Sequence, residues 1–356
     1  MPLEHRMQLS NSLKARLCTL LLAASPTSAI HAQQLNLEGQ TGGFITPTAY
    51  VVPSAKGKFF SHPAIGFHFI NTSAVIGDIE TYNITVGMAN RAEAGYSRSV
   101  HQFGNQPTTT ATPLGLSNLW NYTGMNILHG KVIAVKEGMG GEWVPGIAIG
   151  GLVRTGDQFV SGAANATLTG MGKSYTNEDV YVAVTKTWAK PPVPFLLNIG
   201  WKATNATIFG IGGQSTRFGG RFFGGLGIPL PIGHGLVAVP SGGFTQEPRT
   251  AVNLNTLLNA ALYQCEAAHA CNPASYPLMS AHLPTTLDYA VRITQRDNAH
   301  FSFDIGVGQV AGNIGSIYVA NPFFNPANPA FGPPVVTTPV NLQARSVVGM
   351  GLSFRY

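Results

Sequence analysis

The sequence VVGMGLSFRY, residues 347–356, ends the chain with apolar and small side chains in strict alternation. One parity is apolar and contains Val348, Met350, Leu352, Phe354 and Tyr356, whereas the other contains glycine, serine and arginine. Because successive side chains of a strand point to opposite faces, this end of the chain has one apolar face and one small or polar face. A soluble strand can show the same pattern, but an aromatic residue closing such a strand is typical of an outer-membrane barrel.

The composition of the whole chain agrees with that interpretation. Charged residues make up 10% of the 356 residues and glycine occurs 42 times, against averages of roughly 25% and about 7%. The mean hydropathy is only +0.12, and no run of about 20 apolar residues follows the first 30, so helical membrane spans are not expected. Low charge with near-zero hydropathy suits a wall between lipid and water, or a glycine-rich secreted β-protein.

Twelve stretches alternate with the period of a strand, and two of them are weaker. The ten clear stretches are 64–70, 82–88, 91–97, 145–153, 179–188, 195–202, 221–228, 286–293, 300–307 and 342–356. The two weaker stretches are 127–135 and 235–244.

The connectors between these stretches alternate between short and long along nearly the whole chain. Short connectors include 89–90, 138–142 and 296–299, and long ones include 245–284 and 311–340. Bacterial outer-membrane barrels have short periplasmic turns, longer outer loops and an even number of strands. The sequence therefore predicts an all-β fold: a single antiparallel transmembrane β-barrel of about 12 strands, within a range of 10–14.

Aromatic residues fall where the interfaces of a membrane are expected. Trp143, Trp188 and Tyr356 would lie at periplasmic strand ends, and Trp201 at an outer end, as in aromatic girdles. Arg98 and Lys186 fall on the lipid-facing parity near strand ends, where the cost of a charge is lower.

Residues 1–32 have the pattern of a secretory signal, with a basic start, an apolar stretch and a small-residue end. These residues contain three basic and one acidic side chains, so the mature chain would carry 18 basic and 14 acidic ones. That excess is too small and dispersed for nucleic-acid binding. We assign 33–58 to an N-terminal periplasmic or partial-plug segment and 59–356 to the barrel.

The N-terminal segment reads LEG-x-TGG-x-x-TPTAY over residues 37–50, and an R-x-E-x-GY run follows at 91–96. These motifs resemble a family of Gram-negative outer-membrane barrels of unknown function. That family is itself similar to barrels linked to exopolysaccharide. The resemblance implies a barrel in a membrane and no catalytic residues.

Parity assigns a set of polar side chains to the lumen. Twelve strands lie between the filled interior of eight and the aqueous channel of 16–18, so the lumen would be wet but narrowed. Basic residues outnumber acidic ones in this set, which predicts a mild anion preference; alternatively, Asp288, Arg292, Asp304 and Arg345 pair as a rigid ladder. The lumen-lining candidates are Arg91, Glu93, His101, Lys202, Arg217, Arg221, Asp288, Arg292, Asp304, Arg345 and Arg355.

Cys265 and Cys271 predict a local disulfide in an exported protein. His269 between them leaves a metal site open, but a fourth ligand is missing and we assign no metal. The loop 245–284 is expected to cover the mouth or bind an outside partner.

An enzymatic reading rests on His300 and Ser302, which alternate onto one face of a strand, so that a base could activate the serine. Parity turns both inward and no orienting acid is evident. We expect no enzyme activity and no cofactor.

The sequence thus predicts a porin-like barrel of the bacterial outer membrane that gives passive or export-associated passage to small polar or anionic solutes. The alternative is a non-conducting structural or assembly partner, for example in polysaccharide export. Expected partners are outer-membrane lipid, small polar solutes, and the barrel assembly machinery through the last strand with Phe354 and Tyr356.

Overall fold

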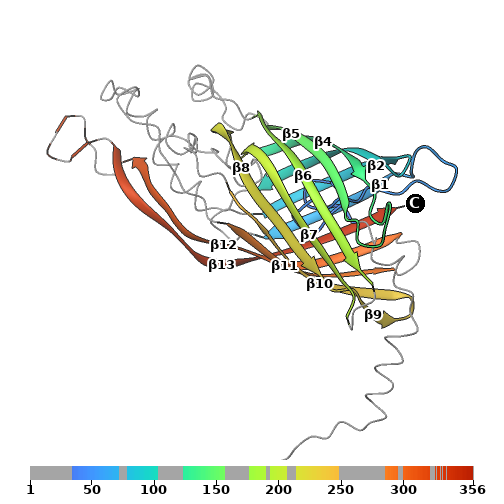
Figure 1. Cartoon of the computed structure of the whole chain (residues 1–356). Helices are drawn as coiled ribbons and strands as arrows, with labels where there is room; N and C mark the ends of the chain where they lie inside the picture. The colour runs from blue at the N-terminus through green and yellow to red at the C-terminus, as the bar shows by residue number, and fades with distance from the viewer. Residues whose placement is uncertain are drawn as a thin grey trace, which may run out of the picture.

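The computed structural model describes residues 34–71, 78–102, 123–156, 176–189, 193–206, 214–247, 285–295, 300–320, 325, 327–328, 330, 332–333 and 335–355. These residues form thirteen strands and no helix that is long and apolar enough to span a membrane. The strands, labelled in Figure 1, are β1 Ala64–Asn71, β2 Asp78–Met88, β3 Ala92–Gln102, β4 Thr123–Val135, β5 Gly146–Gly156, β6 Thr176–Trp188, β7 Phe195–Ala206, β8 Gln214–Gly227, β9 Leu230–Gly233, β10 Leu236–Thr245, β11 Thr286–Gln295, β12 Phe301–Ala320 and β13 Val335–Arg355.

The strands close into a single antiparallel barrel. Consecutive strands pair with each other, except that β8 pairs with β10 in place of β9. β10 also pairs with β11, and β13 pairs with β1. The ring therefore contains twelve strands, and the four-residue β9 pairs with β10 outside it. Closure gives every strand of the ring a partner on both sides, so the barrel has no sheet edge to protect.

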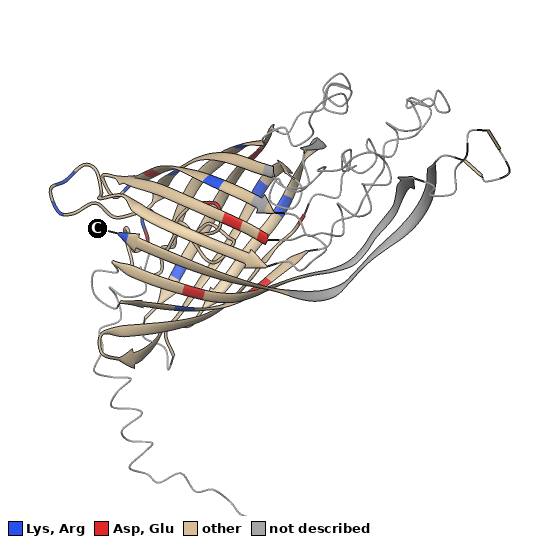
Figure 2. Cartoon of the chain, turned by 180° about the vertical axis from the view of Figure 1, so that it is seen from behind, with Lys and Arg blue, Asp and Glu red and all other residues tan. Residues whose placement is uncertain are grey.

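Side-chain parity separates the two faces of the wall. The outer rows are apolar and exposed, as at Ile65, Leu128 and Ile199, which are 56%, 62% and 52% exposed. The inner rows are polar and buried, as at Thr85 and Asn198. Few charged residues interrupt the wall in the view coloured by charge (Figure 2). This arrangement, apolar outside and polar inside, is that of transmembrane barrels.

The predicted fold class is confirmed, and each of the twelve predicted stretches overlaps one strand of the ring. Two connectors contain strand residues that the sequence did not predict. The predicted loop 311–340 is partly strand, because β12 continues to Ala320 and β13 begins at Val335. Pairing to β11 stops at Val310 and pairing to β1 at Val348, so this hairpin projects beyond the ring (Figure 1). The short stretch 229–235 contains β9.

Glycines of β7 and β8 make room for aromatic rings. A Cβ atom on Gly200 would lie 2.1 Å from the Phe223 ring, and one on Gly220 would lie 2.9 Å from Trp201 Nε1. The Phe223 ring lies inside the wall and is 1% exposed, and Trp201 lies outside. These glycines therefore pack large side chains on both faces of the wall.

Candidate functional site

Residues 34–54, here called the inner segment, lie inside the barrel rather than beside it. They form no regular strand and are held in a compact path by the bridges Leu35–Thr41 and Gly42–Pro47. Most of their side chains are buried, with Gln34, Leu35 and Asn36 each 0% exposed. The polar inner face of the wall therefore contacts protein along this segment.

A buried ion pair fixes the centre of the inner segment. Lys131 on β4 lies 2.9 Å from Glu93 on β3, and both side chains are 0% exposed. Glu93 accepts hydrogen bonds from the backbone N–H groups of Thr41 and Val52 at 3.0 Å each. Lys131 donates to the carbonyls of Thr41 and Thr48 at 2.9 and 3.0 Å. Two buried charges are tolerated because both are paired and hydrogen-bonded.

Arg154 on β5 forms the second charged attachment. Its Nη2 atom lies 2.5 Å from Glu38 Oε1 in the inner segment and 2.8 Å from Asp179 Oδ2 on β6. Its Nη1 donates to Asn177 Oδ1 at 3.2 Å. Arg154 is 1% exposed, so one guanidinium joins β5, β6 and the inner segment without contact with solvent.

Neutral hydrogen bonds continue the attachment around the wall. Thr85 on β2 donates to the Gly39 carbonyl at 2.6 Å, and Asn198 on β7 donates to the Pro47 carbonyl at 2.9 Å. Gly39 has a φ of +86°, and a Cβ atom there would lie 2.3 Å from Ser97 Oγ on β3. Only glycine fits this position, because the backbone is left-handed and close to the wall.

Glu137 in the turn between β4 and β5 anchors the far end of the segment. It accepts hydrogen bonds from the Tyr50 hydroxyl at 2.5 Å and from the Thr187 N–H at 2.7 Å, and Lys186 lies at 2.9 Å. Burial alone would raise the pKa of Glu137, but these hydrogen bonds and the charge of Lys186 hold it below its ordinary value. Lys186, which belongs to the outward row of β6, is therefore paired with Glu137 at the end of that strand.

The other predicted lumen residues are spread over several strands and a turn and have different partners. Arg292 and Asp304 form a two-point pair at 3.0 and 3.2 Å. Asp288 is 4% exposed, Lys202 shares a small cavity with Glu38 and Asp179, and Arg221 donates to the Glu247 carbonyl at 2.7 Å. Arg91 contacts the Ile133 carbonyl beside a turn, and Arg355 is half-buried at the end of β13. The side chains of His101, Arg217 and Arg345 lie outside the described part of the structure, as do Cys265, Cys271 and Tyr356.

Sequence reasoning missed four of the charges that hold the inner segment: Glu38, Lys131, Arg154 and Asp179. Lys131 lies in a stretch whose alternation is weak, and Arg154 follows the predicted end of its strand. Asp179 shares its parity with Tyr181 and Thr185, both buried in the structure. That parity was the available signal, since a charge in an inward row must have a partner.

His300 and Ser302 form hydrogen bonds with different partners and not with each other among the contacts of the described residues. A ring nitrogen of His300, which is exposed, lies 2.9 Å from the Arg355 carbonyl. The Ser302 hydroxyl is buried and donates to Gln34 Oε1 of the inner segment at 2.5 Å. Ser302 thus contributes to holding the segment.

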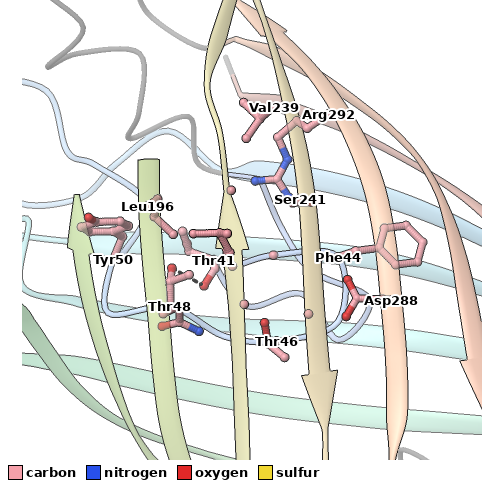
Figure 3. Close-up of a pocket in the computed structure, with 18 of the residues that line it drawn as sticks. Thr41, Phe44, Thr46, Thr48, Tyr50, Leu196, Val239, Ser241, Asp288 and Arg292 are labelled. Atoms are coloured by element: carbon pink, nitrogen blue, oxygen red, sulfur yellow. Dashed lines mark hydrogen bonds between the residues drawn. The ribbon is translucent and has the colours of Figure 1, made fainter. Parts of the chain in front are cut away.

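A cavity of about 80 Å³ lies on the other side of the inner segment, against β8, β10 and β11. Figure 3 shows Thr41, Thr46 and Thr48 of the segment facing Ser241 and Asp288 of the wall across it. The segment therefore fills the lumen unevenly. It forms dense polar contacts with β2–β7, and the cavity of about 80 Å³ separates it from parts of β8, β10 and β11.

A closed barrel with an apolar exterior and a lumen occupied by its own N-terminal segment defines the class: a barrel of the outer-membrane type. Residues 32–221 match the family described as "Protein of unknown function (DUF3034)", and the chain belongs to this family. A search of curated proteins found no match.

Several solved barrels show distant similarity to the chain. The structure titled "KdgM porin" has a TM-score of 0.39 and 6% identity, covering 82% of this chain and 99% of that one. LpxR from Salmonella typhimurium has a TM-score of 0.42 and 8% identity, with coverages of 82% and 100%. The translocator domain of the autotransporter NalP from Neisseria meningitidis has a TM-score of 0.30 and 10% identity, with coverages of 83% and 87%. Similarity at this level carries no argument about function.

Proposed function

We propose that this protein is a porin-like barrel of the bacterial outer membrane that admits small polar solutes through a lumen narrowed by its inner segment. The observation that carries the proposal is the combination of an apolar outer face with a polar inner face that retains a cavity beside the segment. A wall of this kind is stable where lipid surrounds it and water or protein fills it.

The inner segment determines which charges a solute meets. Lys131 and Arg154 are 2% and 1% exposed while the segment is in place. Its removal would take away the acidic Glu38 and no basic residue. The mild anion preference expected from the sequence therefore belongs to a lumen from which the segment has been withdrawn, in which Lys131 and Arg154 would face water.

Two measurements test the proposal. Density-gradient fractionation of cell membranes should find the protein in the fraction that contains lipopolysaccharide, and planar-bilayer recording on the purified, folded protein then measures conductance. We expect small unitary currents from the wild-type chain. Deletion of residues 34–54 is expected to increase the unitary conductance several-fold and to shift the reversal potential toward anion selectivity.

The alternative is a non-conducting partner barrel, for example in polysaccharide export. The dense attachment of the inner segment by Glu93, Lys131 and Arg154 favours this second candidate, because it blocks much of the lumen. A wild-type protein that remains silent in bilayers, while the deletion variant conducts, would support the partner role and contradict passage of solutes.

A further inference from the structure

The cavity beside the inner segment is lined on its wall side by residues that keep it open. Four glycines of β8 and β10 line it with backbone atoms alone, and Leu196 and Val239 add apolar surface. Phe44 of the segment lines the same space. A single buried water needs roughly 10–15 Å³, so about 80 Å³ holds a group of several atoms. The four glycines are Gly225, Gly227, Gly242 and Gly243.

Asp288 on β11 lines this cavity, and one oxygen of its carboxylate lacks a hydrogen-bond partner among the described residues. The residue is 4% exposed, and its Oδ1 atom has no hydrogen-bond partner among the described residues. Figure 3 shows the side chain near Thr46 of the inner segment. Burying a carboxylate oxygen without a donor is costly, since the lost hydration is not replaced.

Gly243 on β10 leaves the room that the carboxylate occupies. A Cβ atom on Gly243 would lie 2.5 Å from Asp288 Oδ1, which no side chain tolerates without displacing the acid. The two residues are partners in the β10–β11 ladder. The glycine and the acid together therefore form a small, preformed acceptor site in the wall.

The other charges near the cavity compensate one another. Arg292 also lines it, but its Nε and Nη2 atoms contact Asp304 at 3.0 and 3.2 Å, so that pair is close to neutral. Lys131 and Arg154 are covered by the inner segment. Among the described residues around this space, Asp288 is left as the charge without a counter-ion in direct contact.

We propose that this cavity binds the cationic end of small solutes that carry a primary ammonium group on a short apolar body. The ammonium would donate to the Asp288 carboxylate, a charge-assisted hydrogen bond stronger than a neutral one. The apolar body would lie against Phe44, Leu196 and Val239. The inference rests on the proposed function in that solutes reach the cavity through the lumen.

Calorimetric titration of the folded, full-length protein in detergent tests this with three probes of one size: butylammonium chloride, sodium butyrate and 1-butanol. We expect butylammonium to bind, and butyrate and butanol to bind at least tenfold more weakly. Asp288→Asn should weaken butylammonium binding at least tenfold, because the amide keeps the shape and loses the charge. Gly243→Ala should also weaken it by displacing the carboxylate.

Two variants serve as matched controls and should leave binding unchanged. Asp78→Asn makes the same change on the outward parity of β2. Gly130→Ala places a methyl group where the nearest atom, the Glu93 carbonyl oxygen, is 3.8 Å away. Binding of butanol or butyrate as strong as that of butylammonium, an unchanged affinity in Asp288→Asn, or binding of none of the probes would overturn the inference; the last result would mean that the cavity holds only water.

The same titration separates this inference from the proposed function. Butylammonium binding in a protein that carries no current would refute passage and leave the site standing. Unitary currents in a protein that binds no butylammonium would retain passage and refute the site.

Discussion

Arg154 joins three polar side chains in a space that excludes water. Its guanidinium contacts Glu38, Asp179 and Asn177. The planar group suits this position because it can donate to several acceptors in fixed directions. The sequence could not single it out, because Arg154 follows the predicted end of its strand and its acidic partner Glu38 lies more than a hundred residues away.

Arg154→Met should destabilise the folded barrel by about 3–5 kcal/mol, since it leaves Glu38 and Asp179 buried without the cation that contacts both. The free energy of unfolding in guanidinium chloride, followed by gel mobility of unheated samples, measures this. The triple variant Arg154→Met, Glu38→Gln, Asp179→Asn should recover most of the loss, because no buried charge is left unpaired. A single variant as stable as the wild type would show that the ion pairs do not form.

At the scale of elements, the twelve strands could be predicted because alternation depends only on local sequence and each strand has one lipid-facing row. The extension of β12 and β13 beyond the ring could not, because it depends on their pairing with each other after β11 and β1 have ended. The short β9 was missed for a related reason. It forms a hairpin with β10, and its four residues are too few to show the alternation of a strand.

We expect the attachment of the inner segment at Glu137, in the turn between β4 and β5, to be sensitive to acid. The pKa of Glu137 is lowered in the folded protein, so its contribution to stability is present above the pKa of the unfolded chain. It is lost as the pH falls through the lower, folded value. The exchange rate of the Thr187 N–H, which donates to Glu137, should therefore rise relative to intrinsic exchange on acidification between the unfolded and the folded pKa of Glu137.

Glu137→Gln provides the control for this effect. The amide keeps an acceptor for Thr187 but no longer titrates, so the exchange rate relative to intrinsic exchange should become independent of pH across the same range. An equal acid response in both proteins would assign the effect to another group.

At the scale of the whole molecule, the barrel and the inner segment depend on each other. Closure satisfies the backbone of the wall, which a membrane requires, and the segment supplies partners for polar side chains that would otherwise need water. Side-chain parity predicted a polar interior. It could not predict the path of the segment, because three glycines and irregular backbone give residues 34–54 no period that would place them against particular strands.

The most direct test of this arrangement is disulfide capture between the segment and the wall. A Cβ atom on Gly66 would lie 3.4 Å from Leu35 Cβ, and one on Gly146 would lie 3.4 Å from Ala49 Cβ, near the spacing of about 3.5–4.5 Å that disulfides need. In a chain with Cys265→Ser and Cys271→Ser, the pairs Leu35→Cys with Gly66→Cys and Ala49→Cys with Gly146→Cys should each oxidise to one cross-link, identified by peptide mass spectrometry. The control pair Ala49→Cys with Gly130→Cys should remain reduced. Cross-links in both test pairs and none in the control are predicted; free thiols in both test pairs of a correctly folded barrel would contradict a lumen occupied by residues 34–54.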